Sequence, residues 1–135
     1  MKHILLVEDD ESLRSLLRIS LEKMGYTVTE ARDGKEALKL YKDAPVDLVL
    51  TDIMMPEKEG LEIIRELRRG NPELKIIAMS GGGRTNARDT LKMAKLFGAT
   101  AVFGKPFSFV ELRTMVVKLL SPEDPDNSDP VFERE

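Results

Sequence analysis

The feature of the sequence that most limits its fold is a regular alternation of short apolar runs with amphipathic helical patterns. Five short runs are predicted strands, and most of them have the near-continuous apolar character of strands that are buried on both faces. They occupy residues 3–7, 27–31, 47–51, 75–79 and 100–104. Strands that alternate with helices in this way predict a parallel sheet with right-handed crossovers. We therefore predict an α/β fold of the (βα)5 type, with helices on both faces of the sheet.

The segments between these runs repeat their apolar residues with the period of a helix, so that each predicted helix has one apolar face. The first predicted face consists of Leu13, Leu16, Leu17 and Met24. Two later faces consist of Leu61, Ile64 and Leu67, and of Leu112, Met115, Val116 and Leu119. Capping boxes at helix starts and glycine caps at helix ends are predicted at Asp33 with Glu36, Ser108 with Glu111, Gly25, Gly70 and Gly98.

The composition favours one domain of ordinary size followed by a tail. The chain has 135 residues, 41% of them hydrophobic, and a net charge of −3, which argues against nucleic acid as the main partner. It has no cysteine, and no stretch approaches the roughly 20 apolar residues of a membrane span. We predict a cytoplasmic protein without direct binding to DNA or membranes. Residues 1–120 form the predicted domain, and the acidic, proline-rich residues 121–135 form a tail that we expect to be disordered.

Polar groups follow four of the predicted strands at the point where each strand ends. They are Glu8, Asp9 and Asp10 after the first strand, Asp52 after the third, Ser80 and the glycine run 81–83 after the fourth, and Lys105 after the fifth. In a parallel sheet these ends open on one edge, where ligands bind. Carboxylates without histidine or cysteine indicate a hard cation such as Mg²⁺. A further carboxylate can act as a nucleophile toward phosphorus, while a lysine and a hydroxyl contact phosphoryl oxygens.

Each of these groups has an ordinary explanation when it is taken alone. Asp10 fits the N-cap of a helix that begins at Glu11, and Ser80 fits a turn. The glycine run lacks the spacing of a nucleotide-binding loop, and Lys105 fits a solvent-exposed position. Because four strand ends would meet at one edge, we interpret these groups together as a site for metal-dependent phosphoryl transfer.

Three stretches of the chain resemble the receiver domain of bacterial two-component response regulators. "ILLVEDDESLRSLL" is similar to the family's opening strand with its acidic pair, "DLVLTDIMMPEKEGLEII" to its phosphoacceptor segment, and "GKPFS" to its lysine–proline motif. The resemblance covers about residues 2–120. It implies the flavodoxin-like fold of that family, with a five-stranded parallel sheet in the order 2-1-3-4-5, as in the stand-alone chemotaxis receivers.

The resemblance also implies a role for each residue of the predicted site. Asp52 is the expected phosphoacceptor. The expected ligands of Mg²⁺, or of Mn²⁺ in its place, are Glu8, Asp9, Asp52 and the backbone carbonyl of Met54. Ser80 is the expected switch hydroxyl, and Lys105 is the expected contact to the phosphoryl group.

Two features depart from the pattern of the family. The family usually places an aromatic switch residue three positions before the lysine, where this chain has Val102. Phe103 comes one position later, and we expect it on the other side of the strand because neighbouring strand residues face opposite ways. The segment from Ser80 to Gly98 is also a few residues longer than in the family.

We therefore expect a phosphorylation-dependent signalling switch that is not an enzyme for external substrates and catalyses only its own phosphorylation and dephosphorylation. Asp52 would accept a phosphoryl group from the phosphohistidine of a sensor histidine kinase or phosphotransfer protein. An unidentified downstream protein would be contacted through the predicted fourth helix, fifth strand and fifth helix, a face that also allows a weak homodimer. Met1 and the charged tail favour a complete single-domain protein over an excised receiver.

Three other functions stay open at this point. An aspartate-nucleophile phosphatase would need a second acid where this chain has Met54. A flavodoxin-like cofactor binder has only the glycine run 81–83 in its favour. A degenerate receiver that acts as a scaffold is favoured by Val102 alone, since the other expected phosphorylation residues are present.

Overall fold

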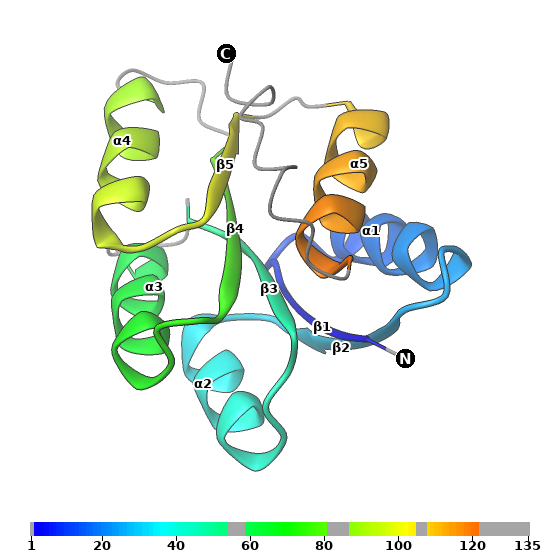
Figure 1. Ribbon diagram of the computed structural model, residues 1–135, viewed down its shortest axis with the longest axis horizontal. Coiled ribbons are helices and arrows are strands. Elements are labelled where there is room, and N and C mark those ends of the chain that lie inside the picture. The colour runs from blue at the N-terminus through cyan, green and yellow to red at the C-terminus, as the bar shows by residue number, and fades with distance from the viewer. Residues whose placement is uncertain (1, 54–58, 81–86, 105–107, 122–135) are drawn as a thin grey trace.

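The computed structural model describes residues 2–53, 59–80, 87–104 and 108–121, and only the backbone at 59–60, 80 and 87–91. Strands and helices alternate within these ranges as the sequence predicts (Figure 1). In chain order they are β1 His3–Val7, α1 Glu11–Lys23, β2 Thr27–Ala31, α2 Gly34–Asp43, β3 Leu48–Asp52, α3 Glu59–Gly70, β4 Lys75–Ser80, α4 Ala87–Phe97, β5 Ala101–Gly104 and α5 Phe109–Leu120. No helix in the described ranges is both long enough and apolar enough to cross a membrane.

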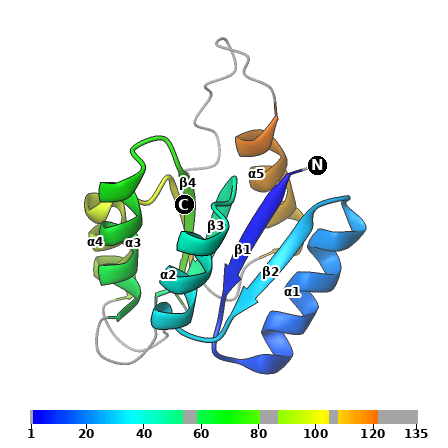
Figure 2. The same cartoon turned by 90° about the horizontal axis from the view of Figure 1, so that it is seen from below.

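The five strands pair in parallel in the order β2-β1-β3-β4-β5, which leaves β2 and β5 at the two edges of the sheet. The strand order reverses between β1 and β3, which are direct neighbours and pair Val7 with Thr51. Figures 1 and 2 show the sheet between two layers of helices, with α1 and α5 on one face and α2, α3 and α4 on the other. The predicted fold class and strand order are confirmed.

Most of the strands read as near-continuous apolar runs because both faces of the sheet are covered. In β1, Leu5 and Val7 pack against the layer of α2, α3 and α4, whereas Ile4 and Leu6 pack against the layer of α1 and α5. The predicted apolar faces of α3 and α5 are confirmed, since their residues belong to these two cores. Each helix needs only one apolar face because its other side meets solvent.

The predicted apolar face of α1 is wrong in one residue. Leu16 is 55% exposed, whereas Leu17 and Leu21 are buried. Leu13 and Met24 pack against the same core. Leu13, Leu17 and Leu21 are four residues apart and therefore form one stripe along the helix, while Leu16 lies about 100° around the helix axis from Leu17.

The helix ends follow the predicted capping residues with two differences. Asp33 accepts a hydrogen bond from the Glu36 N–H at 2.8 Å, but the Glu36 carboxylate accepts from the Arg32 N–H instead of returning to residue 33. Ser108 caps α5 by accepting from the backbone N–H groups of Val110 and Glu111. The glycines at the ends of α1 and α4 have φ of 99° and 122°, as the glycine-cap prediction requires. Gly70 is instead the last residue of α3 and has no positive φ.

The cap at Asp33 allows a first stability prediction. Asp33→Ala is expected to lower the free energy of unfolding by about 1 kcal/mol, because the substitution removes the acceptor for a first-turn N–H of α2. Lys39→Ala, at an exposed position of the same helix, serves as the matched control and is expected to change stability by less than about 0.5 kcal/mol. Urea unfolding of both variants measures the difference, and equal midpoints would contradict the role of the cap.

The ends of α3 and α4 are joined by Arg68. Its guanidinium donates to the Gly98 carbonyl at 2.8 and 3.1 Å and to the Pro72 carbonyl at 2.8 Å. It also donates to the Asn71 carbonyl and to Thr100 Oγ1, at 3.2 and 3.4 Å. One helix turn earlier, the guanidinium carbon of Arg65 lies 4.6 Å from the centre of the Phe97 ring. Arg68 therefore donates to carbonyl groups near the ends of both helices, where carbonyls lack a partner within the helix.

Candidate functional site

The carboxyl ends of β1 and β3 bring three carboxylates together. Asp52 is the last residue of β3, one residue later than the predicted strand end, and Glu8 and Asp9 directly follow β1. One carboxylate oxygen from each of these residues lies within 4.8 Å of the other two. Glu8 is 1% exposed and Asp52 is 3% exposed, whereas Asp9 is open to solvent. The structure therefore brings together the three predicted acidic ligands.

The position of Asp52 is fixed by the pairing of β3 with β4. Asp52 stands opposite Met79 in the register, and the Ile53 N–H donates to the Met79 carbonyl at 2.8 Å. Thr51 and Ile53, on either side of it, are buried. The strand therefore holds the Asp52 backbone rigidly at the edge of the sheet where ligands bind in folds of this kind.

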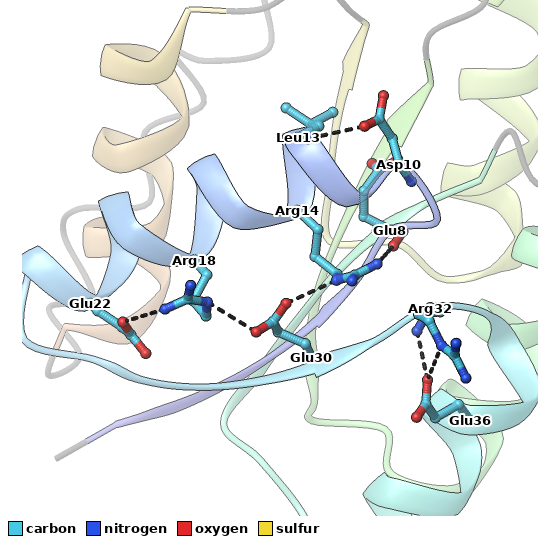
Figure 3. A network of polar contacts seen from close by, with 9 residues as sticks. All are labelled: Glu8, Asp10, Leu13, Arg14, Arg18, Glu22, Glu30, Arg32 and Glu36. Carbon is cyan, nitrogen blue, oxygen red and sulfur yellow. Dashed lines mark hydrogen bonds and ion pairs between the residues drawn. The ribbon is translucent and has the colours of Figure 1, made fainter.

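Hydrogen bonds hold Glu8 and Asp10 in the turn after β1. The Glu8 N–H donates to the Ala31 carbonyl of β2 at 3.1 Å, and Arg14 Nη1 donates to the Glu8 carbonyl at 2.9 Å (Figure 3). The Asp10 N–H donates to Glu8 Oε2 at 3.1 Å. Asp10 itself accepts from the Leu13 N–H and caps α1, as predicted.

The donor set fits a hard divalent cation. Three carboxylates at this separation repel one another, and two of them are withdrawn from water, so a cation between them would relieve the repulsion. All three groups offer oxygen, as Mg²⁺ prefers, and the exposed Asp9 leaves one side open for water or a phosphoryl group. The residues present are therefore suited to hold Mg²⁺.

The other predicted site residues are placed in part. Ser80 ends β4 and pairs with Gly104, the last residue of β5, so both backbones reach the same edge as Asp52. The Ser80 side chain, Met54, the glycine run 81–83 and Lys105 lie outside what the structure describes. Their predicted roles therefore stay predictions.

Val102 and Phe103 lie on opposite faces of β5, as the alternation of strand side chains predicts. Val102 packs against the core under α2, α3 and α4, and Phe103 packs against the core under α1 and α5. The position of the family's switch aromatic is thus taken by a smaller aliphatic side chain, and Phe103 does not stand in for it.

His3 lies at the opposite end of the sheet from the carboxylates, in agreement with the absence of a predicted catalytic role. Its Nε2 lies 2.6 Å from Thr29 Oγ1, and its backbone N–H donates to Asp47 Oδ2 at 2.8 Å. The sequence reasoning missed Arg14, whose contact with the Glu8 carbonyl joins α1 to the site. Its spacing of four residues from Arg18 places both on one side of α1, but neither spacing nor composition indicates a backbone acceptor.

A family model of the response regulator receiver domain matches residues 4–117. The chain belongs to this family. The receiver protein CpdR of Brucella abortus is 37% identical over 123 residues, which are 89% of this chain and 98% of CpdR. The sensor kinase CckA of the same species is 40% identical over 90% of this chain, but this receiver domain spans only 13% of CckA and 52% of several other curated relatives.

The fold agrees with this assignment. The response regulator TrrA of Thermotoga maritima, solved in complex with Mg²⁺ and beryllium fluoride, superposes with a TM-score of 0.77 at 38% identity. The match covers 89% of this receiver domain and 100% of the TrrA chain. The strand order 2-1-3-4-5 and the pattern of five helices are those of the receiver fold.

Proposed function

We propose that this receiver domain is a signalling switch that accepts a phosphoryl group on Asp52 in a reaction that depends on Mg²⁺. The observation that carries the proposal is the placement of a nearly buried Asp52 carboxylate within 4.8 Å of the Glu8 and Asp9 carboxylates at the switch point of the sheet. A related protein of the same fold was solved with Mg²⁺ and beryllium fluoride, which supports the proposal.

Glu8, Asp9 and Asp52 would hold the cation, together with the Met54 carbonyl that the family resemblance implies. Bound there, Mg²⁺ would neutralise charge on the phosphoryl oxygens. One Asp52 oxygen attacks phosphorus, the new O–P bond forms, and the bond from phosphorus to the donor breaks with its electron pair returning to the donor. Burial of Asp52 limits the access of water to the reacting carboxylate. The Ser80 hydroxyl and the Lys105 ammonium are proposed to contact the transferred phosphoryl group.

The proposed donor is the phosphohistidine of a sensor histidine kinase or a phosphotransfer protein in the cytoplasm. The proposed output is a change in the face formed by α4, β5 and α5, which would bind a downstream protein or, weakly, a second copy of the chain. Dephosphorylation would be catalysed by the same site, and Mn²⁺ would serve in place of Mg²⁺. Residues 1–120 are proposed as the phosphorylated unit, with residues 121–135 outside it.

Incubation with acetyl phosphate tests the proposal. We expect intact-mass spectrometry to show a single added phosphoryl group when Mg²⁺ is present and none when a chelator removes it. The adduct should appear with Mn²⁺ as well. A protein that stays unmodified with acetyl phosphate and Mg²⁺, and whose spectra do not respond to beryllium fluoride, would contradict the proposal and favour a scaffold.

A further inference from the structure

Arg14 connects three elements beside the carboxylates. Its Nη1 donates to the Glu8 carbonyl at 2.9 Å, and its Nε donates to Glu30 Oε1 of β2, also at 2.9 Å (Figure 3). The Arg14 side chain is 11% exposed, so it lies largely under the turn that follows β1. An arginine that is inserted this deeply, with one donor on backbone and one on a carboxylate, has a defined orientation.

Arg14 acts at the residue where the β1 backbone leaves the sheet. The paired register of β1 and β2 ends at Val7 and Ala31, and the Glu8 N–H makes a last bond to the Ala31 carbonyl. The Glu8 carbonyl points to α1, where Arg14 donates to it. Both backbone polar groups of residue 8 are therefore hydrogen-bonded: the N–H to β2 and the carbonyl to α1. These bonds fix the backbone that carries the buried Glu8 carboxylate and leads to Asp9.

Glu30 in turn holds the Arg14 guanidinium. The Glu30 carboxylate also forms an ion pair with Arg18 Nε at 2.9 Å, and Arg18 Nη1 pairs with Glu22 at 3.1 Å. Charges thus alternate in sign from Arg14 to Glu22 along one side of α1 (Figure 3). Arg18 shares the Glu30 partner but has no bond to the Glu8 backbone, so it is a natural control for Arg14.

We infer that Arg14 is a positioning residue for the cation site, because it fixes the Glu8 backbone and so keeps the Glu8 and Asp9 carboxylates directed at Asp52. This inference rests on the proposed Mg²⁺ site. The charge of Arg14 and its hydrogen bonds predict opposite effects of its removal on the affinity for Mg²⁺. Arg14 is a cation, so by charge alone its removal would strengthen the binding of Mg²⁺. By position, its removal loosens the ligands and weakens the binding, as the loss of groups that orient metal ligands does.

The test is a titration of the full chain with Mg²⁺, in which NMR records the chemical shifts of the backbone amides of Asp9, Asp10 and Ile53. Arg14→Ala is expected to bind Mg²⁺ about ten-fold more weakly than the unsubstituted protein. Arg14→Lys is expected to lose less, because an ammonium can still donate to the Glu8 carbonyl but lacks the planar fork that holds the carbonyl and Glu30 in a fixed geometry. Arg18→Ala is expected to bind Mg²⁺ as the unsubstituted protein does. If Arg14→Ala does not fold, the inference is tested by comparing the Mg²⁺ affinities of Arg14→Lys and Arg18→Ala, of which Arg14→Lys should be the lower.

Equal or tighter Mg²⁺ binding by the folded Arg14 variants would overturn the inference. A second readout needs no metal: the Glu8 and Asp10 amides should exchange hydrogen several times faster in metal-free Arg14→Ala, while amides of α5 keep their rates. Unchanged exchange at residues 8 and 10 would also overturn it. If the unsubstituted protein binds no Mg²⁺, the proposed cation site and the positioning role of Arg14 toward it both fail, and the exchange measurement then shows only whether Arg14 fixes the backbone of the turn.

Discussion

The Asp52→Asn protein is expected to keep its unmodified mass after incubation with acetyl phosphate and Mg²⁺, whereas the unsubstituted protein gains one phosphoryl group. The amide nitrogen and oxygen of asparagine do not attack phosphorus as a carboxylate does. The substitution also removes one of three negative charges whose oxygens lie within 4.8 Å of one another, so it weakens the proposed cation site at the same time. We expect the adduct to disappear completely.

Asp47→Asn is the matched control for this experiment. Asp47 immediately precedes β3, at the end opposite to Asp52, where its carboxylate accepts from the His3 N–H at 2.8 Å. This variant should be phosphorylated like the unsubstituted protein. An adduct that persists in Asp52→Asn would show that another carboxylate is the acceptor and would contradict the assignment.

We expect Asp52→Asn to stay folded, so that unfolding does not account for the loss of the adduct. Without a divalent cation, this variant should be more stable than the unsubstituted protein by about 1 kcal/mol, since repulsion among the three carboxylates decreases. In Mg²⁺ the unsubstituted protein should gain stability by binding, and Asp52→Asn should gain much less. Thermal unfolding with and without Mg²⁺ measures both effects. A stability gain from Mg²⁺ that is equal in the two proteins would contradict a role of Asp52 in the cation site.

The second large effect is expected at the opposite end of the sheet. Arg68→Ala should lower the free energy of unfolding by about 3 kcal/mol, because it removes the donors to three backbone carbonyls and the packing of the arginine stem. Arg69→Ala, at the exposed neighbouring position, should change stability by less than about 0.5 kcal/mol. Urea unfolding measures the pair, and equal effects of the two substitutions would contradict the role given to Arg68.

A double-mutant cycle with Gly98 sharpens this test. A Cβ atom at Gly98 would lie 2.9 Å from Arg68 Cγ, and Gly98 has a φ of 122°, which side chains rarely adopt. Gly98→Ala therefore has a steric cost that depends on Arg68 and a backbone cost that does not. In the Arg68→Ala background the contacts with Cγ and Nε are gone, and only the contact with Cβ at 3.1 Å and the backbone cost remain, so Gly98→Ala should destabilise less there. Strictly additive effects would contradict the close contact.

The sequence predicts the fold well because the signals it contains are local and repeated. Apolar runs between helical patterns predict strands buried on both faces, and the acids at positions 8, 9 and 52 fall at strand ends whatever the details of packing. Local signals fail where a difference of one residue matters. Leu16 is apolar and lies next to Leu17, yet it is exposed, because only the stripe of Leu13, Leu17 and Leu21 faces the core.

Contacts between residues that are far apart in the chain leave no local pattern in the sequence. Arg68 and the Gly98 carbonyl are 30 residues apart in the chain, and Arg14 meets Glu30 across 16 residues. Any exposed arginine on a helix has the same local sequence features, and only the packing of α1 on β2 and of α3 beside α4 selects these two. The roles of Met54 and Lys105 rest on the sequence and on the family resemblance, because both residues lie outside the described residues.

The positions of β2 and β5 at the edges of the sheet bear on how the protein behaves when it is concentrated. A long, flat, apolar edge strand is a template on which another chain can add a strand and start an aggregate. Here β5 has only four residues and ends in the exposed Gly104. The other edge strand, β2, carries the charged Glu30 among threonines. Neither edge offers a long apolar template, so the addition of strands at the edges is disfavoured and the chain should resist association into fibres.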